Sequence, residues 1–355
     1  MSLEVAREGD RVPVCHQLLV SEVISETADA VSLIFELTSY QEERFGYRPG
    51  QFLTLRLPTP DGQLARCYSL SSSPHTDNAL KVTVKRVAGG RASNWICDHV
   101  TPGTVLDALE PAGIFTPRSL DDDVLLLAAG SGITPVMSII KSLLTVGTGS
   151  IVLCYANRDE ASVIFAEELR RLELAHPGRL TVRHWWESVS GTPTEDGIGE
   201  LIAGDTFSEV FVCGPKPFMN LARRALRANG IDRSRIQIER FASLGGDPFD
   251  GAVAAGRHGH AGGTGSSRLD LDTGGQRRTI DWPSDTRLLD LLLAHGVDAP
   301  SSCGEGVCAS CECRVVEGEV RMVNNQVLDE EDIAEGYVLA CQALPATPSV
   351  HISLE

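Results

Sequence analysis

Four cysteines near the C-terminus have a spacing that restricts how the chain can fold. Cys303, Cys308 and Cys311 lie within nine residues, and 29 residues separate Cys311 from Cys341. Three thiolates on one tight loop, with a fourth from a distant segment, form the pattern that holds a [2Fe–2S] cluster. These four cysteines are therefore the predicted cluster ligands, and the fold must bring two separate segments together.

Two other interpretations of these cysteines are open. Zinc sites usually contain paired Cys-x2-Cys units, and only Cys308 and Cys311 form such a pair among the four. Structural cysteines at these spacings by chance are the second alternative. Cys313 is expected on a strand and is interpreted as structural rather than as a ligand. Small residues suit a loop that wraps a cluster, and they are Ser301, Ser302, Gly304, Gly306, Ala309 and Ser310.

The segments around the cysteines resemble those of plant-type ferredoxins. Leu288–Gly296 is similar to the helix that precedes their cluster loop, and residues 336–343 are similar to their segment around the last ligand. Gly304 stands where Arg is frequent, and Ala309 stands where Gly or Ser is usual. The resemblance implies an α+β domain of the β-grasp type over residues 268–355.

The N-terminal part of the chain, residues 12–118, has the pattern of an antiparallel β-barrel. Strands are predicted at 31–37, 51–57 and 80–86, the last two with alternating apolar and polar residues. Turn pairs of Pro-Gly or Asp-Gly stand at 49–50, 61–62 and 102–103. Short strands separated by such turns are typical of a small barrel.

From residue 121 the pattern changes to alternating strands and helices. Val124–Ala129 is a continuous apolar run, as expected for a strand buried on both faces. Further strands are predicted at 150–156, 180–184, 210–213 and 237–241, and helical segments at 135–144, 165–174 and 216–229. This order predicts a doubly wound parallel α/β domain over residues 121–250. Gly251–Ser267 contains six glycines and is expected to be a flexible linker.

Arg66-Cys67-Tyr68-Ser69 resembles the flavin motif of the ferredoxin–NADP reductase superfamily. Such a resemblance implies that Arg66 pairs with a flavin phosphate, that Tyr68 packs on the ring and that Ser69 hydrogen-bonds near its reactive nitrogen. An ordinary strand is the alternative for these four residues alone. Further cofactor-binding residues follow at the spacing of the family, and they are Val84, Lys85, Gly90, Ala92 and Ser93. The Gly-x-x-Ser segment favours FAD, while the phthalate dioxygenase reductase type keeps FMN open.

A second motif predicts a nicotinamide site. Gly130-Ser-Gly132-Ile-Thr134-Pro135 stands between a buried strand and a helix, where backbone amides and a helix N-terminus meet a pyrophosphate. The segment Cys213-Gly214-Pro215 follows a later strand and matches the second signature of the superfamily. Ser69, Cys213 and Phe241 are the predicted catalytic residues: Cys213 near the nicotinamide, and Phe241 either covering the flavin or packed as a core aromatic.

Asn157-Arg158-Asp159 follows the second predicted strand of this domain and bears on the choice of nucleotide. An acidic residue at this position can accept hydrogen bonds from the ribose hydroxyls and repel a 2′-phosphate, which favours NADH. Arg158 could instead bind that phosphate. We expect NADH, with Gly130, Gly132, Thr134, Asn157, Arg158, Asp159, Gly214 and Pro215 as nicotinamide-binding residues.

The charge of the chain restricts its partners. The net charge is −17 over 355 residues, which argues against nucleic acid. Residues 269–355 contain 16 Asp or Glu against 5 Arg or Lys, forming either a solvated face or a docking surface for a basic partner. The chain lacks an apolar stretch of membrane-spanning length and an N-terminal signal pattern, so we expect a cytoplasmic protein without membrane contact.

Across nearly its whole length the chain resembles the oxygenase reductases with FAD, NAD and ferredoxin domains in that order, and among them the 3-ketosteroid 9α-hydroxylase reductases. The shared segments are 65–74, 81–100, 125–138, 155–159 and 213–215. The resemblance implies an NADH-dependent oxidoreductase that splits hydride pairs into single electrons for a Rieske-type oxygenase acting on steroids. The alternatives are a reductase for phenylacetyl-CoA or another aromatic substrate, a stand-alone diaphorase, and a flavin diaphorase with a cluster-free C-terminal binding module.

Overall fold

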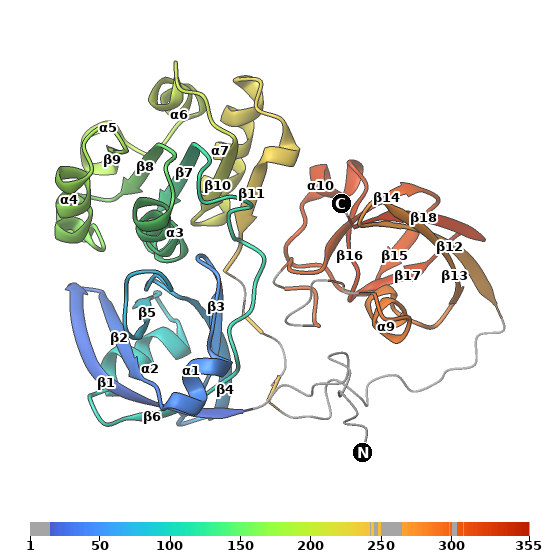
Figure 1. Cartoon of the computed structure of the whole chain (residues 1–355), viewed down its shortest axis with the longest axis horizontal. Helices are drawn as coiled ribbons and strands as arrows, with labels where there is room; N and C mark the ends of the chain where they lie inside the picture. Colours follow the sequence, from blue (N-terminus) through green and yellow to red (C-terminus); the bar gives the residue numbers. More distant parts are fainter. Residues whose placement is uncertain are drawn as a thin grey trace. The chain divides into compact units, whose positions relative to one another are not determined.

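The computed structural model describes residues 15–241, 243–244, 248–249, 265–297, 299, 304–307 and 309–354. They form two compact units, divided after Phe241 (Figure 1). Most of the expected linker, residues 251–264, lies outside the described residues. The expectation that this linker extends to Ser267 is corrected, because Ser266 and Ser267 already pair with the next strand.

The first half of residues 15–241 is an antiparallel barrel, as predicted. Its sheet has the order β4-β3-β6-β1-β2-β5, and a bridge between Leu70 and Val82 joins the two ends. The elements are β1 (His16–Thr27), β2 (Ala30–Glu36), α1 (Ser39–Arg44), β3 (Phe52–Thr59), β4 (Gly62–Ser69), β5 (Leu80–Lys85), α2 (Arg91–His99) and β6 (Val105–Ala108). Side chains such as Leu18, Leu33 and Leu55 fill the interior and are fully buried.

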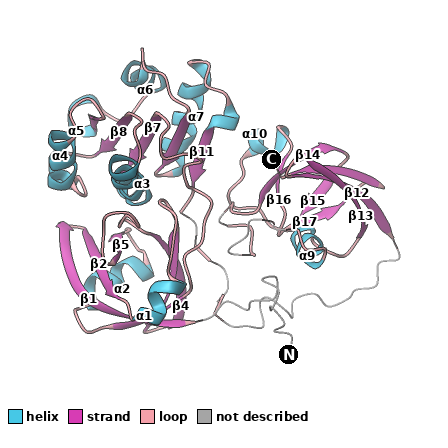
Figure 2. Ribbon diagram, in the orientation of Figure 1, coloured by secondary structure: helices cyan, strands magenta, loops and turns pink. Residues whose placement is uncertain are grey.

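The second half is a parallel sheet with helices on both faces, which confirms the doubly wound prediction (Figure 2). The strand order is β11-β10-β7-β8-β9. The strands are β7 (Val124–Ala129), β8 (Ile151–Asn157), β9 (Leu180–Trp186), β10 (Glu209–Cys213) and β11 (Ile236–Glu239). The helices are η2 (Gly130–Gly132), α3 (Ile133–Val146), η3 (Glu160–Ser162), α4 (Ala166–Ala175), α5 (Glu187–Ser190), α6 (Glu195–Ile202), α7 (Lys216–Ala228) and η4 (Arg233–Arg235).

Strand β7 shows why the continuous apolar run was diagnostic. Leu126 packs into the core beneath α3 and α4, whereas Leu125 and Leu127 pack into the core beneath α6 and α7. Each fully buried leucine contributes about 1.5–3 kcal/mol of transfer free energy, so a polar residue at either face would be costly. The last strand is shorter than expected at its end: β11 stops at Glu239, and Phe241 lies beyond it.

The second unit has the α+β arrangement that the ferredoxin resemblance implied. Its five-stranded sheet has the order β13-β12-β18-β14-β16, in which β12 and β18 are parallel and the other pairs antiparallel. Strands β15 and β17 form a separate pair. The elements are β12 (Ser266–Thr273), β13 (Gln276–Pro283), α9 (Leu288–Ala294), β14 (Glu312–Glu317), β15 (Val320–Met322), α10 (Glu330–Ala334), β16 (Tyr337–Leu339), β17 (Ala343–Pro345) and β18 (Ser349–Ser353).

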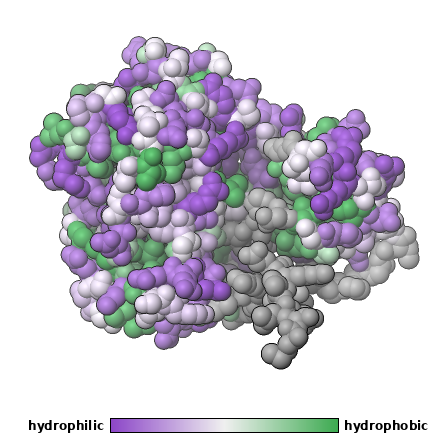
Figure 3. Space-filling view, in the orientation of Figure 1, coloured by the Kyte–Doolittle hydropathy of each residue, from purple (hydrophilic) through white to green (hydrophobic). Residues whose placement is uncertain are grey.

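The surface mixes hydrophilic and hydrophobic residues. On the face seen in Figure 3, hydrophobic side chains are scattered among hydrophilic ones rather than gathered in a continuous band. In the described part of the chain, none of the helices combines the length and apolarity needed to span a membrane.

Candidate functional site

The strand order of the parallel sheet reverses between β7 and β10. Ligands of doubly wound domains bind at this point, beyond the carboxyl ends of the strands. Gly132 follows β7 and packs directly against the end of β10: a Cβ on Gly132 would lie 2.0 Å from the carbonyl oxygen of Cys213. Gly130 has a φ of +52°, a conformation that favours glycine. The structure therefore brings together the two glycine motifs that the sequence predicted for the nicotinamide.

Helix α3 begins at this switch point. Gly132 is the N-cap and supplies no side-chain cap, but the amide of Ile133 donates to the carbonyls of Gly130 and Ser131, and Pro135 has no amide proton, so these two positions offer no free amide to a phosphate. Thr134 turns its hydroxyl back to the carbonyl of Ser131, 3.1 Å away. At the end of β8, Asn157 is buried, and its side-chain amide lies near the Tyr155 hydroxyl. Buried polar groups at the ends of these strands fit a polar dinucleotide.

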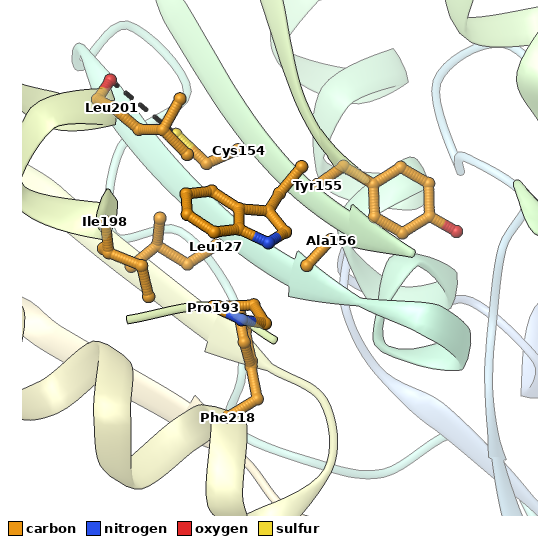
Figure 4. Close-up of a pocket in the computed structure, with 9 residues that line it drawn as sticks. Leu127, Cys154, Tyr155, Ala156, Pro193, Ile198, Leu201 and Phe218 are labelled. Atoms are coloured by element: carbon orange, nitrogen blue, oxygen red, sulfur yellow. Dashed lines mark hydrogen bonds between the residues drawn. The ribbon is translucent and has the colours of Figure 1, made fainter. Parts of the chain in front are cut away.

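A small apolar pocket lies on the α6 and α7 face of the same sheet (Figure 4). Its polar atoms are already engaged within the chain. Tyr155 donates its hydroxyl to the carbonyl of Gly130 at 3.0 Å, Trp185 donates its indole N–H to Gly191, and the Cys154 thiol points to the carbonyl of Leu201. The pocket is lined by Leu127, Cys154, Tyr155, Ala156, Trp185, Pro193, Ile198, Leu201 and Phe218. It therefore offers packing rather than polar recognition.

The tripeptide after β8 is engaged within the protein. Asp159 caps η3 by accepting a hydrogen bond from the amide of Ser162 at 2.9 Å. Arg158 pairs with Asp29 of the barrel, with 2.9 Å between Nη2 and Oδ2. Lys85, at the end of β5, approaches the same carboxylate at 4.0 Å and lies beside Gly130. The carboxyl edge of the parallel sheet is thus bordered by charged residues of both domains.

The flavin motif lies on β4, as its strand-like pattern allowed. Ser69 is buried, and its hydroxyl has no hydrogen-bond partner in the described part of the chain. Tyr68 packs at the edge of the barrel core, and burial raises the pKa of its phenol well above the usual value. The Cys67 thiol lies 3.5 Å from the Thr54 hydroxyl, and Arg66 contacts the carbonyl of Ala65. An aromatic ring and an unpartnered hydroxyl on neighbouring residues of one strand fit a motif that binds a ring system with polar atoms, such as a flavin.

The residues predicted at the flavin pyrophosphate lie around the start of α2. Gly90 is the N-cap of this helix, and Ala92 and Ser93 are buried in its first turn. The Ser93 hydroxyl accepts a hydrogen bond from the amide of Val87, which holds the preceding turn against the helix. Val84 is buried in the barrel core, so only its backbone is available to a cofactor.

The three predicted catalytic residues differ in exposure. Cys213 is fully buried, and burial raises the pKa of its thiol well above 9. In the parallel register Cys213 lies beside Glu239, whose pKa is raised to about 8 by desolvation. Phe241 is 49% exposed, so the alternative of a core aromatic is wrong. No contact joins Ser69, Cys213 and Phe241 in the described structure, so their common role stays a prediction.

Two of the four predicted cluster ligands are described, and they lie together. The backbone amide of Cys341 donates to Cys311 Sγ at 3.4 Å, and both residues are buried. Gln342 donates from Nε2 to Cys341 Sγ at 3.4 Å and to the carbonyl of Gly304 at 2.8 Å. Cys303 and Cys308 lie outside the described residues. Adjacent thiols that receive N–H donors fit an iron–sulfur cluster, whose sulfurs accept such bonds.

Cys313 agrees with its interpretation as a structural residue. It lies on β14, opposite Val338, and its side chain is buried in the core. Burial raises the pKa of its thiol to about 12, so it stays protonated at neutral pH.

Sequence reasoning missed the contacts that join the two halves of residues 15–241. Lys141 of α3 is 5% exposed and lies 2.6 Å from Asp77 and 3.4 Å from Glu168. Ser73 and Ser142 share a buried hydrogen bond of 2.7 Å across the same boundary. A lysine inside an apolar helix pattern was the available signal, but its partners are distant in the sequence.

Three family models match consecutive parts of the chain. They are described as an oxidoreductase FAD-binding domain at residues 17–116, an oxidoreductase NAD-binding domain at 126–224 and a 2Fe-2S iron-sulfur cluster binding domain at 272–346. These matches identify the cofactors as FAD, NADH and a [2Fe–2S] cluster, and the chain as an oxidoreductase.

Relatives extend the similarity over the whole chain. A 3-ketosteroid-9-alpha-monooxygenase ferredoxin reductase component of Rhodococcus rhodochrous is 52% identical over 95% of this chain and 96% of its own length. A component of the 1,2-phenylacetyl-CoA epoxidase of Escherichia coli is 33% identical over 96% of this chain and 98% of its own. The solved phthalate dioxygenase reductase shares the fold, with a TM-score of 0.58 at 21% identity over 96% of this chain and 98% of that one. The chain belongs to the family of oxygenase reductases that combine FAD-binding, NAD-binding and 2Fe-2S domains.

Proposed function

We propose that this chain is the reductase of a steroid 9α-hydroxylating system and that its partner is a Rieske-type terminal oxygenase. The observation that supports this most strongly is the 52% identity to a 3-ketosteroid-9-alpha-monooxygenase reductase component along nearly all of both chains. Half of the residues are shared across three domains, which is more than a common electron-transfer fold requires. The partner oxygenase determines the final substrate.

In this proposal each domain holds its cofactor with the residues that the sequence indicated. The FAD-binding residues are Arg66, Cys67, Tyr68, Ser69, Val84, Lys85, Gly90, Ala92 and Ser93. The nicotinamide-binding residues are Gly130, Gly132, Thr134, Asn157, Arg158, Asp159, Gly214 and Pro215, and the cluster ligands are Cys303, Cys308, Cys311 and Cys341. We propose the domain bounds 12–118, 121–250 and 266–355, with 251–265 as the linker.

The bound cofactors supply hydride acceptance from NADH and one-electron transfer, and the protein supplies their placement. The glycine turn before α3, where Gly130 has a positive φ, would let the pyrophosphate of the nucleotide approach the backbone. The orphaned hydroxyl of Ser69 donates a hydrogen bond to the flavin ring. The neutral thiol of Cys213 keeps the end of β10 uncharged, so negative charge does not oppose the approach of the nucleotide.

The acidic ferredoxin domain provides the docking surface of the proposal. Its 16 acidic against 5 basic residues over 269–355 leave an excess of 11 negative charges. Complementary charge speeds the encounter with a basic partner and is screened by salt. We therefore expect electron transfer to the oxygenase to slow as ionic strength rises, while reduction of a small neutral acceptor stays nearly constant.

Reconstitution tests the proposal. The purified holoprotein is mixed with NADH, a 3-ketosteroid and the corresponding oxygenase component, and the 9α-hydroxylated product is measured. A parallel mixture contains a phenylacetyl-CoA oxygenase and its substrate, because the 33% identical Escherichia coli relative favours that second function. Product only in the second mixture would reject the steroid assignment and keep the reductase role.

The variant Cys341→Ser separates a relay from a stand-alone diaphorase. Loss of a cluster ligand should abolish product formation with the oxygenase, whereas ferricyanide reduction by NADH should change less than about twofold because it needs only the first unit. Cys313→Ser, at a buried cysteine outside the ligand set, is the matched control and should retain its iron and sulfide. Unchanged transfer to the oxygenase in Cys341→Ser would contradict the relay.

A further inference from the structure

Asp29 lies in the two-residue turn between β1 and β2, where Thr27 pairs with Ala30. The Thr27 hydroxyl donates to Asp29 Oδ1 at 2.9 Å, and the Asp29 carbonyl accepts from the amide of Arg86 at 2.7 Å. Both backbone and carboxylate are therefore fixed by the barrel. The second carboxylate oxygen, Oδ2, points to the NAD-binding domain.

Arg158 donates a hydrogen bond to that oxygen. It directly follows β8, at the carboxyl edge where doubly wound domains contact the ribose of their nucleotide. Its Nη2 donates to Asp29 Oδ2 at 2.9 Å, and its carbonyl accepts from the amide of Ser188 at 2.8 Å. The arginine that could bind a 2′-phosphate is thus turned to a carboxylate of the other domain.

The acidic residue that usually selects NADH does not act alone here. Asp159 uses Oδ1 to cap η3, so its carboxylate is held by the chain. The tripeptide Asn157-Arg158-Asp159 contains an acidic and a basic residue side by side. Its sequence therefore does not by itself decide between NADH and NADPH. Because Arg158 is paired with Asp29, the basic residue is held away from a 2′-phosphate and NADH is favoured.

The charges around this edge can be compared directly. Lys85 lies 4.0 Å from Asp29 and interacts electrostatically with Arg158, Asp159 and Glu187 as well. Two cations therefore face three carboxylates, which leaves one negative charge. A 2′-phosphate adds nearly two more negative charges. Removal of the Asp29 charge would neutralise the group and release Arg158 at the same time.

We infer that Asp29, a residue of the FAD-binding domain, is a specificity-determining residue for the nucleotide: it holds Arg158 and so disfavours NADPH. The inference rests on the nicotinamide site proposed above. It assigns the discrimination between NADH and NADPH to a contact between the FAD-binding and NAD-binding domains, in which Thr27 orients the Asp29 carboxylate.

The experiment compares Asp29→Asn with the wild-type holoprotein. Calorimetric titration with 2′,5′-ADP and with 5′-AMP reports binding without turnover. We expect the variant to bind 2′,5′-ADP about 10-fold more tightly, the size of one hydrogen bond from a charged donor to phosphate, and 5′-AMP within twofold. The ratio of kcat/KM for NADPH to that for NADH, with ferricyanide as acceptor, should rise by a similar factor.

Three further variants test whether the change in affinity comes from the pair of Asp29 and Arg158. Asp98→Asn removes another exposed aspartate of the barrel, paired with Arg86, and should leave both affinities unchanged. Arg158→Gln should weaken 2′,5′-ADP binding in the wild-type background, because one cation then faces three carboxylates. Added to Asp29→Asn, it should return that affinity to the wild-type value.

Two outcomes overturn the inference in different ways. If the wild-type protein binds 5′-AMP but Asp29→Asn leaves 2′,5′-ADP affinity unchanged, or if Arg158→Gln fails to reverse the gain, Asp29 does not set specificity and the site itself stands. If neither nucleotide binds the wild-type protein while NADH still reduces it, the proposed nicotinamide site fails and the inference fails with it.

Discussion

The two units of the chain place their functional residues differently relative to their cores. In residues 15–241 the nicotinamide motifs lie at strand ends, and the buried hydroxyl of Ser69 has no hydrogen-bond partner in the described part of the chain. In the C-terminal unit Cys311 and Cys341 belong to the hydrophobic core itself, together with Leu339. In the first unit the candidate cofactor-binding motifs lie at the ends of strands, whereas in the C-terminal unit the predicted ligand cysteines are part of the hydrophobic core.

This difference predicts how each unit depends on its cofactor. The barrel and the parallel sheet have continuous cores of their own, so their folding needs little from FAD or NADH. The core of the ferredoxin unit includes the thiols of two predicted cluster ligands, so binding of iron contributes to its folding. Loss of FAD or NADH should therefore leave the first unit folded, whereas loss of iron should unfold much of the ferredoxin unit.

The largest expected effect comes from removal of iron. Chelation under reducing conditions should expose the backbone amides of residues 265–354 to exchange with deuterium over most of the unit, because the cluster no longer holds the loop to β16. Residues 15–241 should keep their protection. Hydrogen exchange followed by mass spectrometry checks both halves at once, and a protected iron-free ferredoxin unit would remove the contrast.

Replacement of the buried Lys141 tests the stability of the first unit. Lys141→Met leaves Asp77 without its cation, while Glu168 keeps Lys81, and should lower the free energy of unfolding by about 1–3 kcal/mol in urea titrations. Arg170→Met, in an exposed pair with Glu167, should cost at most about 1 kcal/mol. Equal effects of the two variants would show that burial of the pair is energetically irrelevant.

Gln342→Leu changes the electronic surroundings of the cluster. The lost side-chain donor to Cys341 Sγ should lower the reduction potential, because such donors stabilise the more negative reduced state, and stability should fall by about 1 kcal/mol. A spectroelectrochemical titration measures the potential. Gln276→Leu, on the exposed face of β13, serves as the control and should leave the potential unchanged.

A pH effect is expected in the parallel domain. Partial desolvation lowers the pKa of His184, an exposed residue of β9 whose ring stacks on Trp186 with 4.6 Å between the ring centroids. The unfolded chain then binds more protons on this imidazole below its ordinary pKa of about 6.5, so stability is present above that pH and is lost as the pH falls through the lower folded value. Urea midpoints at pH 7.5 and 5.5 should differ less in His184→Gln than in the wild-type chain. Identical differences would exclude this histidine as a source.

The smallest effect concerns the cluster loop. Ala309 has a φ of +57°, where a Cβ is strained by about 1 kcal/mol. Ala309→Gly should relieve that strain, partly offset by the greater freedom of glycine in the unfolded chain. We expect a slight rise in the thermal midpoint of the ferredoxin unit. A fall would show that packing of the alanine methyl group stabilises the unit by more than the backbone strain destabilises it.

Much of the fold could be predicted because it depends on local periodicity. The bounds of β7 match the apolar run Val124–Ala129, and α7 was expected within one residue of its observed end. Predictions failed where periodicity is weak. Ser266 and Ser267 were expected in the linker but pair with Trp282 and Pro283, because hydrogen bonding to an adjacent strand outweighs their flexible composition.

The sequence by itself determined which residues are chemically able to act: the spacing of four cysteines, the glycines before α3 and the Arg-x-Tyr-Ser motif are local patterns with direct chemical meaning. Only the tertiary structure decided which charges meet. Asp29 and Arg158 are 129 residues apart, and Lys141 of α3 meets Asp77 from the loop between β4 and β5. Those contacts depend on how two packed domains fit together, and periodicity along one strand or helix does not encode that fit.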